Sequence, residues 1–348
     1  MTDIQYFHYP KKFIVESGEF LPEFTLAYTT YGKLNAEKNN IIWVIHALTA
    51  NSKVEEWWAG LFGKNNFLDA DKYFIICVNN LGSCYGSTNP LSINKDTEKP
   101  YFYDFPLLTI RDMANALELL RQNLGISRVY MGLGGSQGGQ ILLEWAIINT
   151  QIFEHLFLIA TNAKHSAWGI AFNESQRMAI ENDKTWGEKN EKAGLEGLKT
   201  ARAIALLSYR NYRAYQNTQS ETEHKITNFK AATYQQYQGK KLQQRFNAFA
   251  YYTLSKAMDS HHIGRNRNNL ADALAQIKAK CCVVSISSDV LFPPEEQRFL
   301  AQYIPTNLYF EIDSDYGHDG FLLEYEKILA ILKEFFEKIE QLKKKLKK

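Results

Sequence analysis

The sequence predicts an α/β protein, with a mostly parallel, doubly wound sheet and a helical lid inserted in the second half of the chain. Three observations predict this fold class. Short apolar runs alternate with helical or turn segments, a glycine-rich turn joins one of these runs to a helix, and a long later stretch lacks such runs. Alternation of strands and helices is typical of sheets that carry helices on both faces.

The composition is that of a large globular protein. The chain has 348 residues, of which 45% are hydrophobic, enough for one large core and a dependent subdomain. The formal net charge is only +2, so we expect no basic face for nucleic acid. The first residues lack the apolar segment of a secretion signal, and no apolar run approaches the ~18 residues of a membrane span. We therefore expect a cytoplasmic protein that binds small molecules and does not bind a membrane.

The cysteines do not indicate a disulfide framework or a metal site. Cys77, Cys84, Cys281 and Cys282 are too few and too irregularly spaced for a framework in a chain of this length. Three of them lie in apolar strand-like or turn contexts, so we interpret them as buried thiols. The sequence shows no sign of a metal or of a bound organic cofactor, and we expect neither.

The apolar runs predict the strands of the sheet. They lie at residues 41–48, 73–80, 128–133, 155–160, 281–287 and 308–313. Because these runs are almost continuously apolar, we expect a sheet covered on both faces. Residues 109–125 have their leucines on one helical face and end at a glycine, which predicts a helix. Residues 11–35 alternate like strands with turns, and we expect them to form an antiparallel edge of the same sheet.

One region breaks the alternation of strands and helices. From about residue 165 to residue 275 the chain has no convincing strand run, and its longest stretches, 195–215 and 234–259, are helical in pattern. We expect a lid subdomain at 165–275 over the carboxyl edge of the sheet, where open α/β sheets bind ligands. The core domain would then comprise residues 1–164 and 276–348.

The glycine-rich turn indicates a nucleophilic serine. Residues 134–138 read Gly-Gly-Ser-Gln-Gly, which is the G-x-S-x-G pattern of a nucleophile elbow between a strand and a helix. Flanking glycines let strand and helix approach each other around a strained serine, here Ser136. A tight turn or a phosphate loop is the alternative, but the spacing lacks the pattern of either common phosphate-binding loop.

A nucleophilic serine needs a base and a carboxylate that orients the base. In this type of site they follow in the order Ser, Asp, His. Asp289 comes after the strand run at 281–287, and His318 follows the last run in a glycine-flanked loop. Asp315 is the rival carboxylate, but it lies only three residues before His318 and is disfavoured because both would share one short loop.

The loop after the first buried run should complete an oxyanion hole. Its sequence is "HALTANSK", and the backbone amide of Leu48 is the expected donor beside that of Gln137. His46 in this loop is interpreted as structural. His261 and His262 are interpreted as surface or packing residues of the lid.

Longer strings carry a family resemblance. They include "HALTANS", "NNLGSCYGSTNPLSIN", "GGSQGGQ", "FNESQRMAI", "SDVLFPPEEQ" and "YGHDGFLLE". Over residues 20–330 the chain resembles the homoserine O-acetyltransferases, acyltransferases of the α/β-hydrolase superfamily that serve methionine biosynthesis. These strings are far more specific than G-x-S-x-G alone.

The resemblance implies both a reaction and an assembly. The reaction is acetyl transfer from acetyl-CoA to the side-chain hydroxyl of L-homoserine, by a ping-pong mechanism through an acyl-serine. Acetyl-CoA is then a substrate and not a cofactor. The family also implies a homodimer formed through the lid.

The resemblance assigns residues as well. Ser136, Asp289 and His318 match the catalytic triad of the family. Arg202 and Tyr209 match residues that line the substrate tunnel. In that assignment Arg202 binds the carboxylate of the amino acid and Asp319 binds its ammonium group, one charge at each end of a zwitterion.

The chain departs from the family pattern near the serine. Gln137 and Gln140 stand where the family often has methionine, which leaves the amide of residue 137 in place but puts substrate identity in doubt. Three alternatives therefore stay open: a succinyl donor, a serine acceptor, and an esterase with the same triad. A non-catalytic binding protein is disfavoured because all three triad members are present.

Overall fold

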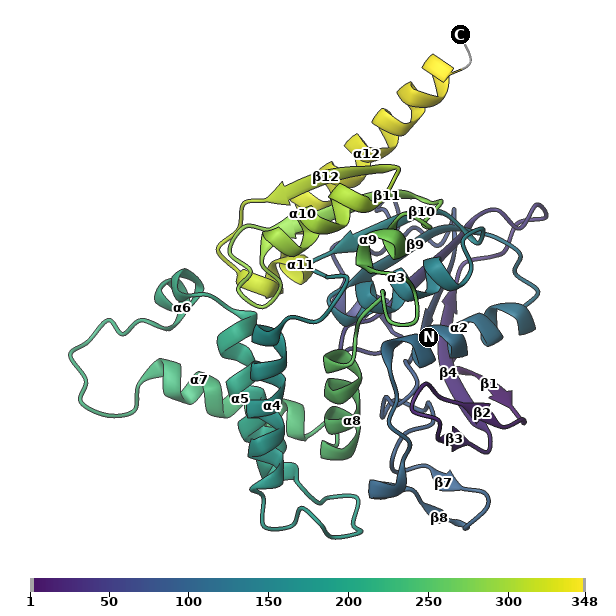
Figure 1. Cartoon of the computed structure of the whole chain (residues 1–348). Helices are drawn as coiled ribbons and strands as arrows, with labels where there is room; N and C mark the ends of the chain where they lie inside the picture. Colours follow the sequence, from purple (N-terminus) through teal and green to yellow (C-terminus); the bar gives the residue numbers. More distant parts are fainter. Residues whose placement is uncertain (1–2, 347–348) are drawn as a thin grey trace.

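The central sheet confirms the predicted fold class. A computed structural model describes residues 3–346, and its eight-stranded sheet has the order β1-β4-β6-β5-β9-β10-β11-β12 (Figure 1). The six strands from β6 to β12 are parallel, and β1 and β4 are antiparallel to their neighbours. The strands are β1 (Gln5–Tyr9), β4 (Phe24–Tyr31), β5 (Ile41–Ile45), β6 (Phe74–Val78), β9 (Val129–Gly135), β10 (Phe153–Ile159), β11 (Lys280–Ile286) and β12 (Asn307–Ile312).

The amino-terminal segment differs in part from the prediction. Within residues 11–35 only β4 joins the central sheet, whereas β2 (Phe13–Ile14) and β3 (Phe20–Leu21) pair with each other in a separate two-stranded sheet. The reason is a tight turn at Gly18, whose φ of 88° folds the chain back on itself. Strand β1, which the sequence did not predict, forms the outer edge. A second small hairpin pairs β7 (Ile93–Asn94) with β8 (Lys99–Pro100).

The sheet is covered on both faces, as predicted. All five residues of β5 are buried. Trp43 and Ile45 belong to a core with α2 (Ile110–Asn123) and α3 (Gln137–Ile148), while Ile42 and Val44 belong to a second core with α1 (Val54–Trp57) and α12 (Tyr325–Leu346). Alternate side chains of a strand point to opposite faces, so a strand between two cores must be apolar throughout.

A helical insertion, which we define as α4 to α9, separates β10 from β11. Its helices are α4 (Ala167–Glu181), α5 (Leu195–Tyr209), α6 (Tyr212–Gln219), α7 (Lys230–Gln243), α8 (Ala248–Asp259) and α9 (Leu270–Leu274). Figure 1 shows α4 to α7 beside the sheet, with α5 packed between α4 and α7. Helix α9 returns to the core and contacts α10 (Pro294–Tyr303). The division into a core and a separate lid subdomain stays a prediction.

The helical stretch predicted at 195–215 is two helices and not one. Helix α5 ends at Tyr209, Arg210 is extended, and the side chain of Asn211 accepts a hydrogen bond from the Ala214 amide to begin α6. Asparagine is a preferred residue at this capping position because it satisfies a free helix amide. The break places Arg210 at a corner of the chain beside the carboxyl edge of the sheet.

Candidate active site

Ser136 lies at the sharp turn between β9 and α3. Its φ is 54° and its ψ is −129°, a backbone conformation that costs non-glycine residues about 1–3 kcal/mol. The turn is possible because neighbouring glycines leave no side chain in the way. A Cβ on Gly134 would lie 2.5 Å from the carbonyl oxygen of Gly138. The turn therefore has the geometry that the G-x-S-x-G spacing predicts.

Ser136, His318 and Asp289 form one chain of hydrogen bonds. The Oγ of Ser136 lies 2.9 Å from Nε2 of His318, and Nδ1 of His318 lies 2.6 Å from Oδ2 of Asp289. The carboxylate accepts from Nδ1–H, which leaves Nε2 free to accept the serine proton. Asp289 is itself fixed, because its Oδ1 accepts from the amides of Leu291 and Phe292.

The residues that the sequence analysis disfavoured for the triad lie elsewhere. The carboxylate of Asp315 pairs with Arg213 at 3.2 Å on the surface, and Nδ1–H of His318 donates to Asp289 instead. His261 is buried, and its Nε2 lies 2.9 Å from the carbonyl oxygen of Asn162. Burial lowers the pKa of His261 to about 3, so this ring is neutral and belongs to the packing.

His46 fixes the loop that precedes Leu48. Burial lowers the pKa of its imidazole to about 4, so the ring is neutral near pH 7. Its Nε2 accepts from the amide of Asn80 at 3.0 Å, so Nδ1 carries the proton and donates to the carbonyl oxygen of Ala47 at 2.7 Å. His46 is therefore structural in a specific way, because its two hydrogen bonds set the path of the backbone into the site.

The amides of Leu48 and Gln137 stay the expected donors of an oxyanion hole. Leu48 lines the same cavity as Ser136, and Gln137 is the first residue of α3. Neither amide donates a hydrogen bond to another described residue. The side chain of Gln137 turns away, donating to the carbonyl oxygen of Leu254 in α8 at 3.1 Å. The side chain of Gln137 therefore ties the elbow to the helical insertion, and its backbone amide has no partner among the described residues.

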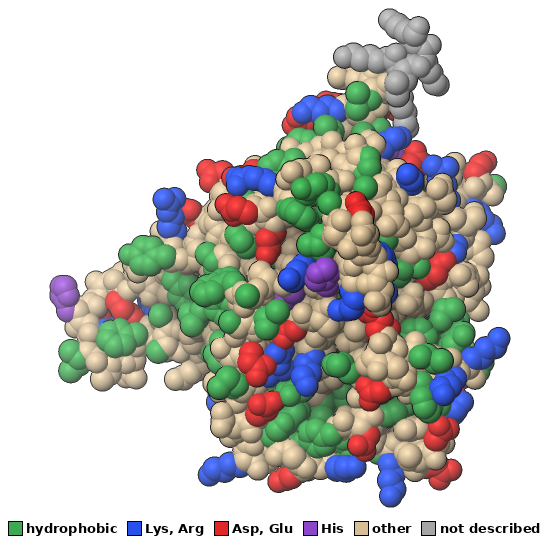
Figure 2. Space-filling model, in the orientation of Figure 1, with side chains coloured by type: hydrophobic (Ala, Val, Ile, Leu, Met, Phe, Trp, Pro, Cys, Tyr) green, Lys and Arg blue, Asp and Glu red, His purple; other side chains and the backbone are tan. Residues whose placement is uncertain are grey.

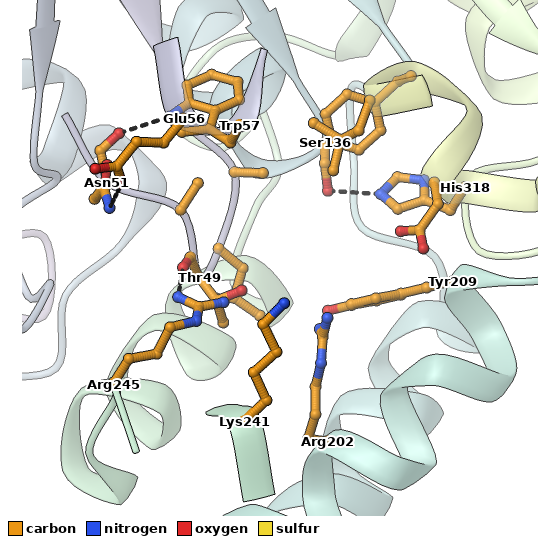
Figure 3. Close-up of a pocket in the computed structure, with 16 residues that line it drawn as sticks. Thr49, Asn51, Glu56, Trp57, Ser136, Arg202, Tyr209, Lys241, Arg245 and His318 are labelled. Carbon is orange, nitrogen blue, oxygen red and sulfur yellow. Dashed lines mark hydrogen bonds between the residues drawn. The ribbon is translucent and has the colours of Figure 1, made fainter. Parts of the chain in front are cut away.

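A cavity of about 420 Å³ opens above Ser136. Figure 3 shows Ser136 and His318 at one end, with Arg202 and Tyr209 below them and Lys241 beside Arg202. Other lining residues include Thr49, Asn51, Glu56, Trp57, Arg245, Asp319 and Phe321. A volume of this size fits a small substrate and the reacting end of a larger one.

The structure brings Arg202, Tyr209 and Asp319 to this cavity. The guanidinium of Arg202 lies 5.2 Å from the centre of the Tyr209 ring, and the Tyr209 ring lies 5.8 Å from that of His318. No described carboxylate lies within 4.0 Å of Arg202, so its charge is available to a ligand. The carboxylate of Asp319, in contrast, already accepts a hydrogen bond from Arg210 at 2.7 Å.

Comparison with known proteins assigns the fold and the family. A sequence model of the alpha/beta hydrolase fold matches residues 40–325. A homoserine O-acetyltransferase of Cyclobacterium marinum is 53% identical over 92% of both chains, and one of Chlorobaculum tepidum is 41% identical over 95% of this chain and 94% of its own. The chain belongs to the homoserine O-acetyltransferase family.

Solved structures agree with this assignment. The homoserine O-acetyltransferase of Staphylococcus aureus is 28% identical, has a TM-score of 0.78 and covers 97% of this chain and 94% of its own. Esterase E22 superimposes with a TM-score of 0.87 over 96% of this chain and 100% of its own, at 24% identity, a likeness that shows the fold alone. Homoserine O-acetyltransferases are acyltransferases, so the chain is an enzyme of that class.

Some residues of this acetyltransferase site were not predicted from the sequence. Asn51 belongs to the "HALTANSK" string and could have been found there, but Lys241 and Arg245 lie in and after α7 with no local signal. The described part of the chain contains no cluster of three His, Cys, Asp or Glu side chains suited to a metal. Among its helices, none combines the length and the apolarity that a bilayer crossing requires.

Proposed function

We propose that this enzyme transfers an acetyl group from acetyl-CoA to the side-chain hydroxyl of L-homoserine through an acyl-Ser136 intermediate. The observation that carries the proposal is the hydrogen-bond chain from Ser136 through His318 to Asp289. Ser136 and His318 line a cavity that Arg202 and Asp319 also line. A triad supplies the acyl-enzyme, and two opposite charges suit a zwitterionic acceptor.

In the first half-reaction, His318 acts as the base. Its Nε2 takes the proton of Ser136 while Oγ attacks the thioester carbonyl carbon. The oxyanion accepts hydrogen bonds from the amides of Leu48 and Gln137. Loss of one such donor typically lowers kcat by ~10²–10³-fold. The carbon–sulfur bond then breaks, and the sulfur of CoA takes the proton from His318. CoA leaves and acetyl-Ser136 remains.

In the second half-reaction, homoserine is the nucleophile. His318 takes the proton of its hydroxyl, the hydroxyl oxygen attacks the acyl carbon, and the bond to Oγ breaks as Ser136 recovers a proton. O-acetylhomoserine is released for methionine synthesis. Water would hydrolyse the same intermediate, so transfer requires a shielded serine. The exposed fractions of Ser136 and His318 are only 5% and 3%, so a reactant reaches them through the cavity alone.

The acceptor would lie between Arg202 and Asp319. Its carboxylate would bind Arg202, which has no described ion-pair partner, and its ammonium group would bind Asp319. Tyr209 lies between Arg202 and His318 and would hold the aliphatic part of the acceptor against the base. A homoserine hydroxyl would then point toward Ser136.

We also propose a cytoplasmic homodimer formed through the helical insertion. Exposed apolar side chains on α4 to α7 support this, and Figure 2 shows hydrophobic side chains over this part of the molecule. They are Trp168, Met178, Leu207, Tyr212 and Tyr237, with exposed fractions of 56%, 52%, 58%, 76% and 59%. Light scattering should give twice the chain mass, and a monomer at micromolar concentration would contradict the assembly.

The decisive experiment measures thiol release from acetyl-CoA and from succinyl-CoA, with homoserine, with serine and with no acceptor. We expect rapid release only with acetyl-CoA and homoserine, with O-acetylhomoserine identified by mass. A preference for succinyl-CoA or serine would change the substrate assignment. Equal release without an acceptor would show an esterase. The Ser136→Ala variant should form no acyl-enzyme, and its retained activity would refute the mechanism.

A further inference from the structure

The last residue of α5 and the residue after it contact two neighbouring residues of the turn that carries the base. Tyr209 lies against His318, with ring centres 5.8 Å apart, and Nε of Arg210 lies 2.7 Å from Oδ2 of Asp319. The turn is η2 (Gly317–Asp319). Since these segments are 109 residues apart in the sequence, the pairing is a property of the tertiary fold.

Gly317 allows this approach. Its φ is 63°, and a Cβ on it would lie 2.9 Å from the carbonyl carbon of Arg210 and 3.0 Å from the carbonyl oxygen of Tyr209. Any side chain here would push the end of α5 away from η2. The end of α5 therefore lies directly against η2. This places Arg210 close enough for its side chain to contact Asp319.

The Arg210–Asp319 pair is partly desolvated and well defined. The two side chains are 23% and 15% exposed, less than in an ordinary surface pair. The guanidinium also lies 5.9 Å from the centre of the Tyr234 ring on α7. Among the described residues, Arg210 and Asp319 have no other ion-pair partner within 4.0 Å. Arg210 is therefore held between a carboxylate and an aromatic ring.

Only one oxygen of Asp319 is used by this pair. Oδ2 accepts from Arg210, while Oδ1 has no hydrogen-bond partner among the described residues, and Asp319 lines the cavity. A carboxylate has acceptor capacity on both oxygens, so one can bind Arg210 while the other binds a ligand. A carboxylate fixed by a guanidinium loses less rotational freedom on binding than a free one.

We propose that Arg210 is a positioning residue that sets the acceptor specificity of the enzyme. It binds Oδ2 of Asp319 and thereby presents Oδ1 to the ammonium group of an α-amino acid, so that an acceptor with this group is favoured over one without it. The proposal rests on the proposed function, because it concerns the second half-reaction at Ser136. Arg210 does not contact the acyl group, so the first half-reaction should be independent of it.

The test compares two acceptors that differ only in the ammonium group. 4-Hydroxybutanoate has the hydroxyl and carboxylate of homoserine but lacks its amino group. For the parent and for Arg210→Gln, the acyl-enzyme is formed from acetyl-CoA, identified by mass, and then mixed with each acceptor. Arg210→Lys, which keeps the charge, is the conservative variant. Arg213→Gln, an exposed arginine nearby that pairs with Asp315, is the matched control.

We expect Arg210→Gln to form the acyl-enzyme at the parent rate and to need about 10–100-fold more homoserine for half-maximal deacylation, the effect of losing one charge-assisted contact. Its rate with 4-hydroxybutanoate should stay within about twofold, so the preference for homoserine falls. Arg210→Lys should recover part of that preference, and Arg213→Gln should match the parent.

The outcomes separate the two proposals. If the parent forms no acyl-enzyme, the proposed function fails and this inference fails with it. If the acyl-enzyme forms but the preference for homoserine is unchanged in Arg210→Gln, the inference alone is refuted. A loss of the same size with both acceptors would also refute it, because it would show that Arg210 serves only to hold α5 in place.

Discussion

Gly138 lies so close to the carbonyl oxygen of Ile45 that a Cβ on the glycine would come within 2.2 Å of that oxygen. The start of α3 and the end of β5 thus meet backbone to backbone. This contact brings the Gln137 amide, one residue before Gly138, close to the loop that carries Leu48. The width of the expected oxyanion hole therefore depends on a glycine that touches no substrate.

The first prediction concerns this contact. Gly138→Ala should displace α3 from β5, because the clash is with backbone, which cannot rotate away. We expect the rate of acyl-enzyme formation to fall at least ~10²-fold, as it does when one oxyanion donor is lost. Stopped-flow thiol release measures this rate. Gly125→Ala is the control: its φ is 63° and a Cβ there meets nothing within 4 Å, so it should cost about 1–2 kcal/mol of stability and leave the rate unchanged. Equal rates in both variants would contradict the prediction.

The second prediction tests the role of Asp289. In Asp289→Asn the side-chain oxygen can still accept from the amides of Leu291 and Phe292, but an NH₂ group then faces Nδ1 of His318. The ring would adopt the tautomer that carries its proton on Nε2 and could not take the proton of Ser136. We expect kcat to fall by about 10⁴ with little change in melting temperature.

Asp315→Asn is the control for this variant. Asp315 is the sequence neighbour of the His318 loop but pairs with Arg213 at the surface, so its loss should change kcat less than about twofold. A large loss of activity in Asp315→Asn, or a small one in Asp289→Asn, would reverse the assignment of the orienting carboxylate.

The third prediction concerns Arg202. Arg202→Gln removes the charge that has no described ion-pair partner at the cavity. We expect the KM for homoserine to rise ~10–100-fold, from the loss of a charge-assisted hydrogen bond, while the KM for acetyl-CoA is unchanged. Steady-state kinetics with each substrate varied in turn measure both constants. A rise in the KM for acetyl-CoA alone would instead assign Arg202 to the donor.

The fourth prediction is a pH dependence of stability. Burial raises the pKa of Glu296 to about 8 from 4.5, Asp289 also raises it, and the Asn162 amide at 3.0 Å partly opposes the shift. Between these two values the folded state holds the proton that the unfolded chain has released. Stability therefore falls as the pH rises through this range.

Glu296→Gln removes this dependence. The difference in unfolding free energy between the variant and the parent should be more favourable to the variant at pH 8.5 than at pH 5, by at least ~1 kcal/mol. This figure is smaller than the full pKa shift implies because the Glu296 side chain is partly exposed to solvent. Urea unfolding at both pH values measures the difference. Glu295→Gln, on the exposed side of the same helix turn, is the control for the loss of one charge. A relative stability of Glu296→Gln that does not change with pH would contradict the prediction.

Much of the site could be predicted from the sequence, for a physical reason. Ser136, Asp289 and His318 each follow an apolar run, and parallel strands bring their carboxyl ends to one edge of the sheet. The local sequence indicates the strands, and the parallel topology brings the residues that follow them together. The Ser136 turn could be predicted too, since its glycines are adjacent in the chain.

Contacts between distant segments could not be predicted in this way. The pairing of Arg210 with Asp319 depends on where α5 ends and on the missing side chain at Gly317. The helical pattern of residues 195–215 gives no sign of the break after Tyr209, because both flanking segments have helical periodicity. The separation of β2–β3 from the central sheet likewise depends on a turn whose direction the pattern does not reveal.

The sequence by itself determined the class of fold, the order of the parallel strands along the chain and the chemistry of the triad, because apolar periodicity and the glycine-rich turn are local properties. Only the tertiary structure decided which charges face the cavity and which are already paired. Arg202 is available while Asp319 is held by Arg210, although both were expected to bind the acceptor. That difference depends on distances between segments far apart in the chain, which are set by packing and not by any local pattern.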